Sequence, residues 1–94
     1  SNTEIEDDVK IDNLVHIAHN VHIGKGAFVI ATAIVCGGVT IGERAWVAPN
    51  ASILEGITIG DDAVVGLNST VLRDVDPSVT VVGSPAKALD ERQS

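Results

Sequence analysis

Hydrophobic and polar positions repeat with a period of six along most of the chain. Isoleucine or valine occupies every sixth position over twelve successive steps. These positions are Ile5, Ile11, Ile17, Ile23, Val29, Val35, Ile41, Val47, Ile53, Ile59, Val65 and Val71. An amphipathic helix repeats about every 3.6 residues and a half-buried strand about every two residues, so neither element explains the spacing. The pattern predicts a series of short strands, each of which turns one branched side chain inward.

The hexapeptides themselves repeat with a longer period of three hexapeptides. The segments 21–27, 39–45 and 57–63 align with one another at this interval, and each has Ile-Gly before a pair of mostly charged residues. Three hexapeptides therefore complete one turn, with Gly, Asp and Asn at the corners between strands. Equivalent residues in neighbouring turns are expected to stack at about 4.8 Å. The repeat predicts an all-β fold, a parallel β-helix of about four triangular coils over residues 3–76.

The two ends of the chain depart from the repeat. Pro77 breaks the register of six, Val79–Val82 is predicted to form one more strand, and residues 85–92 are predicted to form a short helix that begins near Pro85. Residues 77–94 would then cap the last coil, as the ends of solenoids require. Residues 1–2 are interpreted as the remnant of a tag, and the chain as a piece excised from a longer one.

Composition narrows the class of protein. The chain has 94 residues, which allows one domain, and its hydrophobic fraction of 45% argues against disorder. Counting gives 14 Val and 10 Ile against 5 Leu, and Phe28 and Trp46 are the only aromatic residues. Because β-branched residues favour strands over helices, this composition excludes a helical bundle.

Charge and cysteine content limit the partners and the compartment. The formal net charge of −7 argues against binding to nucleic acid or to an anionic membrane surface, which both need clustered cations. The sequence contains no apolar run near the roughly 18 residues of a membrane span. The single cysteine, Cys36, is interpreted as a structural thiol and allows no intramolecular disulfide. We expect a cytoplasmic protein.

Candidate chemistry appears where one corner departs from the repeat. His19 lies at a corner, and the pair Gly37 and Gly38 follows three hexapeptides later, so it is expected one coil above His19. A histidine side chain can accept a proton from a hydroxyl or an amine near neutral pH. A backbone N–H in the next coil can bind a developing oxyanion. These are two parts of an acyl-transfer site, but a solvated histidine beside a simple turn remains the alternative.

Two segments resemble the left-handed β-helix acyltransferases with hexapeptide repeats. Residues 16–24, His-Ile-Ala-His-Asn-Val-His-Ile-Gly, are similar to the histidine-bearing coil of the lipid A UDP-sugar acyltransferases. Residues 82–87, Val-Gly-Ser-Pro-Ala-Lys, are similar to the tail of the CoA-dependent sugar and serine acetyltransferases. The resemblance implies a left-handed coil and an acyltransferase activity.

The resemblance also implies roles for individual residues. His19 falls on the general base, and Gly37 on the backbone N–H that stabilises the tetrahedral intermediate. His16 falls on a neighbouring position that contributes to the acceptor pocket in some members, and Asn20 is expected to bind the acceptor with it. In some sugar acetyltransferases an acidic residue follows the catalytic histidine and orients it, whereas Asn20 stands here, so a second chain is expected to supply the orienting group. The residues expected near the CoA nucleotide are Gly83, Ser84, Pro85, Ala86 and Lys87.

The expected function is transfer of an acyl group to an amine or hydroxyl of a sugar or nucleotide-sugar. The donor is expected to be acetyl-CoA or another acyl thioester, bound as a co-substrate, and the assembly is expected to be a homotrimer. One alternative is an enzyme like the UDP-3-O-acylglucosamine N-acyltransferases, with an acyl carrier protein as donor. Another is a β-helix that serves only in trimer assembly, without catalysis.

Other candidate sites are weaker. The histidines at 16, 19 and 22 suggest zinc, but His16 and His22 fall on different sides of the predicted triangle, so we expect no metal site. Phe28 and Trp46 are three hexapeptides apart and should stack on an outer face, between Lys10 and Val64. This pair is interpreted as a subunit contact, an acceptor surface or a simple cross-strand pair. The acidic residues near the N-terminus are interpreted as a solvated face; they are Glu4, Glu6, Asp7, Asp8 and Asp12.

Overall fold

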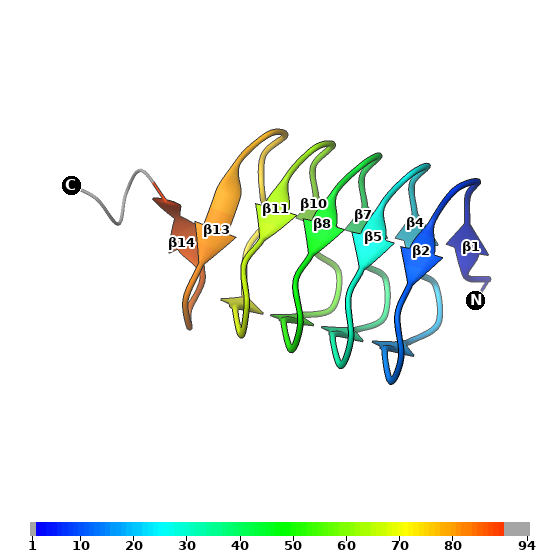
Figure 1. Ribbon diagram of the computed structural model, residues 1–94, viewed down its shortest axis with the longest axis horizontal. Coiled ribbons are helices and arrows are strands. Elements are labelled where there is room, and N and C mark those ends of the chain that lie inside the picture. The colour runs from blue at the N-terminus through cyan, green and yellow to red at the C-terminus, as the bar shows by residue number, and fades with distance from the viewer. Residues whose placement is uncertain (1, 90–94) are drawn as a thin grey trace.

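The protein, described by a computed structural model over residues 2–89, is a parallel β-helix of triangular cross-section (Figure 1). Twelve strands of two residues each recur every six residues, as the sequence predicts. Their bounds are β1 (Glu4–Ile5), β2 (Lys10–Ile11), β3 (His16–Ile17), β4 (His22–Ile23), β5 (Phe28–Val29), β6 (Ile34–Val35), β7 (Thr40–Ile41), β8 (Trp46–Val47), β9 (Ser52–Ile53), β10 (Thr58–Ile59), β11 (Val64–Val65) and β12 (Thr70–Val71). Two further strands, β13 (Thr80–Val82) and β14 (Lys87–Ala88), follow the repeat.

The strands form three parallel sheets, one for each side of the triangle. The first sheet has the order β1-β4-β7-β10, the second β2-β5-β8-β11-β13-β14 and the third β3-β6-β9-β12. Paired residues in the first four coils are three hexapeptides apart, as in Glu4 with His22 and Val29 with Val47. The predicted coil of three hexapeptides is therefore confirmed.

The inward side chains form one continuous apolar stack along the axis. Ile23, Ile41 and Ile59 are fully buried on the first sheet, and the equivalent valines and alanines of the other sides are buried with them. Ile5 and Ile11 hold the same inward positions in the first coil but are 50% and 40% exposed, because no described strand lies beyond them. Burial in this fold therefore depends on a coil lying on each side.

Each corner except that at residues 73–74 turns the chain through one residue in the left-handed region of backbone conformation. Glycine holds this position at Gly26, Gly38 and Gly56. Other residues hold it at Asp8, Leu14, Asn20, Thr32, Arg44, Asn50, Asp62, Asn68 and Ser78, with φ between 57° and 64°. Since side chains as different as those of leucine, threonine and arginine adopt this conformation here, the coil imposes the corner geometry and glycine is not required for it.

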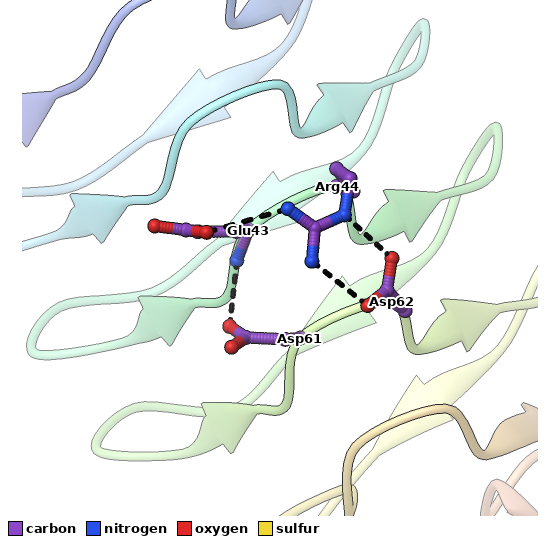
Figure 2. A network of polar contacts seen from close by, with 4 residues as sticks. All are labelled: Glu43, Arg44, Asp61 and Asp62. Carbon is purple, nitrogen blue, oxygen red and sulfur yellow. Dashed lines mark hydrogen bonds and ion pairs between the residues drawn. The ribbon is translucent and has the colours of Figure 1, made fainter.

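At one corner, between the first and second sheets, ion pairs and hydrogen bonds join neighbouring coils (Figure 2). We call it the charged corner; its residues are Lys25, Gly26, Glu43, Arg44, Asp61 and Asp62. Arg44 Nε and Nη2 donate to Asp62 Oδ1 and Oδ2 at 2.8 and 3.0 Å, and Nη1 lies 3.3 Å from Glu43 Oε1. The hydrogen bond from Arg44 and its charge lower the pKa of Asp62, and the same contacts raise the pKa of Arg44.

The C-terminal end differs from the sequence prediction. The strand expected at Val79–Val82 is present as β13, but Val64 pairs with Thr80 where the repeat would place Val82, so this coil is two residues shorter than the others. The prediction of a helix over residues 85–92 is wrong for the first part of this range. There the chain turns, and Lys87–Ala88 forms β14, antiparallel to β13. This pairing satisfies backbone groups at the edge of β13 that a helix would leave open. Residues 90–92 of the expected helix lie outside the described residues.

Within residues 2–89, no helix is both apolar enough and long enough to span a bilayer.

Candidate active site

The corner between the third and first sheets carries the candidate chemistry. We call it the His19 corner; it comprises residues 19–20, 37–38, 55–56 and 73–74. His19 follows β3 and precedes β4, and the pairing of His16 with Ile34 and Ile17 with Val35 brings Gly37 into register with it. Along the axis the first positions of this corner are His19, Gly37, Glu55 and Arg73.

Backbone hydrogen bonds fix His19 and Gly37 side by side. The Gly38 N–H donates to the carbonyl of His19 at 3.2 Å, and the Gly56 N–H donates to the carbonyl of Gly37 at 3.0 Å. A methyl group on the Gly37 Cα would lie 3.8 Å from Cε1 of the His19 imidazole. The structure therefore brings together the two residues that the sequence predicts for general-base catalysis and oxyanion binding.

The N–H of Gly37 has no hydrogen-bond partner within residues 2–89. The corresponding corner N–H groups of Lys25, Ala31, Glu55 and Leu67 are likewise unbonded among the described residues, whereas the Glu43 N–H donates to Asp61 Oδ1 at 2.8 Å. Asn13, in the coil below, has its N–H bonded to Asp12 Oδ1 at 2.8 Å. The Gly37 N–H is left available for an external acceptor such as an oxyanion.

Folding does not explain why residue 37 is a glycine. A methyl group on Gly24 would lie 2.8 Å from the Glu43 nitrogen, and one on Gly42 would lie 2.5 Å from the Asp61 nitrogen, so those positions exclude a side chain. On Gly37 the nearest atom, the carbonyl oxygen of His19, would be 3.4 Å away, which is an ordinary contact. Gly37 is also absent from the left-handed region, where glycine has an advantage. The fold therefore leaves the backbone at Gly37 bare beside His19 without requiring a glycine there.

The predicted acceptor residues lie close to His19 in the chain, and both are exposed. His16 is on β3 in the same coil, and Asn20 is next to His19 with φ of 60°. The His19 imidazole forms no hydrogen bond with any described residue, so no group within residues 2–89 orients it. The roles assigned to His16 and Asn20 stay predictions.

His22 makes contacts that the sequence analysis missed. Its Nδ1 lies 3.3 Å from Glu4 Oε1 and its Nε2 lies 2.6 Å from Glu6 Oε2. Glu4 precedes His22 by three hexapeptides and pairs with it, so the register contained the signal for this contact. His16 and His22 lie on different sheets, as predicted, and the described residues contain no group of three or more His, Cys, Asp or Glu arranged for a metal ion.

The predicted CoA-binding tail borders a hollow of about 730 Å³ at the C-terminal end of the coil. Pro85, Ala86 and Lys87 line it together with Arg73 from the His19 corner. Gly83 and Ser84 bond instead to Thr70, through the Gly83 carbonyl at 3.0 Å and the Ser84 hydroxyl at 3.0 Å. Three of the five predicted residues therefore border the hollow, and three attach the tail to β12, because the Ala86 N–H also donates to the Thr70 carbonyl at 2.8 Å.

The charges at the hollow are mixed. Arg73 and Lys87 form no ion pair with any residue of the described segment. Asp74 and Asp76 also line the hollow, but Asp74 Oδ1 accepts a hydrogen bond from the Thr58 N–H at 2.9 Å. The two cations remain available to an anionic group.

Phe28 and Trp46 form the predicted pair on the second sheet, which lies opposite the His19 corner in the triangle (Figure 1). Their ring centroids are 5.5 Å apart in an edge-to-face arrangement, and Trp46 is 50% exposed. Lys10 and Val64 flank them in register, as expected. Cys36 is a half-buried free thiol beside Gly37.

The profile of the family described as bacterial transferase hexapeptide (six repeats) matches residues 2–37 and 38–73. The chain belongs to this family. Its sequence is 51% identical over 92 residues to UDP-3-O-acylglucosamine N-acyltransferase 2 of Legionella pneumophila (strain Paris), covering 98% of this chain and 27% of that protein. The chain thus spans about a quarter of that relative's length.

Solved structures give the same result for the fold. Soybean serine acetyltransferase matches with a TM-score of 0.86 and 30% identity, over 93% of this chain and 40% of that one. A mutant GDP-perosamine N-acetyltransferase from Caulobacter crescentus, in complex with CoA and GDP-perosamine, matches with a TM-score of 0.66 and 30% identity, over 93% and 53%. The left-handed hexapeptide β-helix implied by the resemblance is thereby confirmed.

Proposed function

We propose that this chain forms part of the active site of an acyltransferase that modifies an amine or hydroxyl of a sugar or nucleotide-sugar. One observation carries the proposal: the His19 imidazole lies beside Gly37, whose N–H is unbonded within the described residues. The fold does not require a glycine at this position. Support comes from the relatives, which are named as acyltransferases of UDP-3-O-acylglucosamine, serine and GDP-perosamine.

The geometry supports a direct transfer without a covalent enzyme intermediate. His19 accepts the proton of the acceptor as its nitrogen or oxygen attacks the thioester carbonyl carbon. The carbonyl oxygen takes up the negative charge and accepts a hydrogen bond from the Gly37 N–H. The tetrahedral intermediate then collapses, the carbon–sulfur bond breaks, and the leaving thiolate takes the proton from the imidazolium. His16 and Asn20 bind the acceptor beside His19.

The donor in this proposal is an acyl-CoA, with acetyl-CoA as the first candidate. Three coil steps of about 4.8 Å separate the His19 coil from the Arg73 coil, so about 14 Å lies between the reacting centre and the hollow. An extended pantetheine arm covers that distance, so in this proposal the nucleotide lies near Lys87, which borders the hollow. The CoA complex of the perosamine enzyme supports this choice of donor.

An acyl carrier protein is the second candidate donor. The relative with 51% identity is a UDP-3-O-acylglucosamine N-acyltransferase, and the resemblance implies a carrier-protein donor for such enzymes. Carrier proteins are acidic and need a basic docking surface, which a chain of net charge −7 is poorly suited to provide. Acyl-CoA therefore remains the first choice.

The proposed assembly is a homotrimer with the His19 corner facing a neighbouring chain. Within the described residues nothing orients the His19 imidazole, and the half-exposed Trp46 lies on the opposite side of the triangle. Packing that side of one chain against the His19 corner of the next would bury the aromatic pair. It would also let the neighbour supply the orienting group.

The test is a thiol-release assay with acetyl-CoA, and in parallel an acyl carrier protein thioester, against a panel of nucleotide-sugars. His19→Ala should lower turnover by roughly 10²–10⁴, the usual contribution of general-base catalysis. Its melting temperature should not change, because the side chain is exposed. Lys25→Ala, at the next corner of the same coil, is the control and should retain activity. A fully active His19→Ala protein would contradict the proposed mechanism.

A further inference from the structure

The segment before β1 places one hydroxyl group beneath the His19 corner. Thr3 lies one coil below Val21, because β1 and β4 pair in register. Its hydroxyl donates to the Ala18 carbonyl at 3.1 Å, and the Val21 N–H donates to the hydroxyl oxygen at 3.4 Å. A single side chain therefore joins the two ends of the turn that carries His19.

This turn differs from the turns at the other two sides of the triangle. At the corners that follow the first and second sheets in the second to fourth coils, the N–H of the fourth residue donates to the carbonyl of the first, as Ala27 does to Gly24 at 3.2 Å. Among the described residues, no such bond joins Val21 to Ala18. The His19 corner is therefore an open turn, and the Thr3 hydroxyl bridges its two ends as acceptor and donor.

A hydroxyl group at this position is a departure from the repeat. The residues stacked above Thr3, one in each successive coil, are all apolar and buried; they are Val21, Val39, Ile57 and Val75. Threonine differs from valine by a hydroxyl in place of one methyl group, so the packing of the coil does not account for it. The hydrogen bonds to the two ends of the turn do account for it.

The direction of the His19 side chain depends on the backbone of this turn. The imidazole forms no hydrogen bond with any residue that the structure describes, so no side chain in that part of the protein holds the ring. From the coil above, the Gly38 N–H donates to the His19 carbonyl at 3.2 Å. From the coil below, Thr3 holds the residues on both sides of the turn. These contacts together fix the backbone from which the imidazole projects.

We propose that Thr3 is a positioning residue for His19: its hydroxyl bridges the open turn and so sets the direction of the imidazole beside Gly37. The inference rests on the proposed function, in which His19 is the general base. In the proposed trimer the neighbouring chain orients the ring, whereas Thr3 fixes the backbone that carries it. Since a small displacement of a catalytic group has a large effect on rate, loss of the hydroxyl lowers turnover without weakening substrate binding.

The substitution Thr3→Val separates positioning from packing, because it gives the position the side chain that Val21 has in the same row. It should lower kcat by about tenfold to a hundredfold and leave KM for both substrates within about twofold of the wild type. The melting temperature should not fall. Thr3→Ser keeps the hydroxyl and should restore kcat.

The matched control removes a hydroxyl from a corner that is remote from His19. Thr32 lies between the second and third sheets, and its hydroxyl donates to the Ala31 carbonyl at 2.6 Å. Thr32→Val makes the same chemical change as Thr3→Val and also removes a hydrogen bond to a corner carbonyl. It should keep the wild-type kcat.

A double-variant cycle shows whether Thr3 acts through His19. In the His19→Ala background the imidazole is gone, so Thr3→Val should not lower the residual rate further. Hydrogen exchange of the Val21 amide gives a readout that needs no turnover. Exchange should be faster in Thr3→Val than in the wild type and should return to the wild-type rate in Thr3→Ser, because the amide regains its acceptor.

The outcomes separate this inference from the proposed function. A lower kcat in Thr3→Val, its recovery in Thr3→Ser and no further effect in the His19→Ala background support the inference. Wild-type turnover by Thr3→Val, or a loss of rate that persists without His19, overturns it and leaves His19 as the general base. A loss of rate matched by a fall in melting temperature also overturns it, in favour of a purely structural role. A fully active His19→Ala protein overturns the proposed function and, with it, the role assigned to Thr3.

Discussion

At the scale of single residues, glycines that look alike in the sequence have different reasons to be glycine. Gly42 is held by the approach of the next coil, whereas Gly37 has room for a side chain. The sequence predicted the pairing of His19 with Gly37, because a register of three hexapeptides is visible without coordinates. It did not predict which glycines the fold requires, because that depends on how closely backbone atoms of neighbouring coils approach.

This difference gives a prediction for Gly37. Gly37→Ala should lower turnover by about tenfold or more while the melting temperature stays close to that of the wild type, because its methyl group lies beside the imidazole and meets no atom closer than 3.4 Å. Gly42→Ala should show the opposite result: a clear loss of melting temperature, because its methyl group would meet the Asp61 nitrogen at 2.5 Å. Steady-state rates and thermal melts decide the matter. Equal loss of stability in the two variants would favour a purely structural role for Gly37.

Ser69 gives a second prediction at this scale. Its hydroxyl is buried, with 1% of the residue exposed, and has no hydrogen-bond partner among the described residues. Alanine stands at the equivalent positions Ala33 and Ala51 in the two preceding coils. Ser69→Ala should therefore stabilise the protein by about 1 kcal/mol, since it removes an unsatisfied buried polar group. Ala51→Ser is the reverse control and should destabilise the protein in a denaturant titration. No gain from Ser69→Ala would mean that the hydroxyl has a partner, such as a buried water.

At the scale of elements, two-residue strands are stable only because every coil repeats the same pattern. The period of six predicted the twelve strands of the repeat, and the break at Pro77 was visible as a loss of that period. The strand β14 was missed because its pairing is antiparallel and lies outside the repeat. Its position depends on the turn after β13, for which hydrophobic periodicity carries no information.

The charged corner predicts a pH dependence for the contacts between coils. Arg44 lowers the pKa of Asp62 below its ordinary value of 3.8, so the folded state favours the ionised carboxyl. The stabilisation is therefore complete above that ordinary value and is lost as the pH falls through the lower pKa of the folded state. Asp62→Asn should lower the melting temperature slightly at pH 7, and the difference from the wild type should disappear in strong acid. Added salt should also reduce it, because the pair is exposed. A difference unchanged across this pH range would show that the ion pair is not its cause.

At the scale of the whole molecule, the sequence predicted the β-helix of a single chain well, but it carried less information on how chains assemble. The period fixes which side chains point inward, but outward residues such as Trp46 and Leu54 carry no signal of what covers them. The same period also assigns Trp46 to the side opposite the His19 corner, which the sheet order confirms. The candidate site and the aromatic pair lie on opposite sides of the same chain. In the proposed trimer, the aromatic pair of one chain therefore meets the candidate site of a neighbouring chain.

The proposed trimer makes the last prediction. Sedimentation equilibrium at micromolar concentration should give three times the monomer mass of 9.7 kDa. Trp46→Glu should yield a monomer, because it places a charge where apolar area would otherwise be buried between chains. The same variant should lose acyl transfer, although Trp46 is on the opposite side from His19 in its own chain, because the neighbour no longer completes the site. Leu14→Glu, at a position that is 85% exposed, is the control and should remain trimeric and active. A monomeric Trp46→Glu protein that retains full activity would show that His19 needs no second chain, and the orienting group would then have to come from the solvent or the acceptor itself.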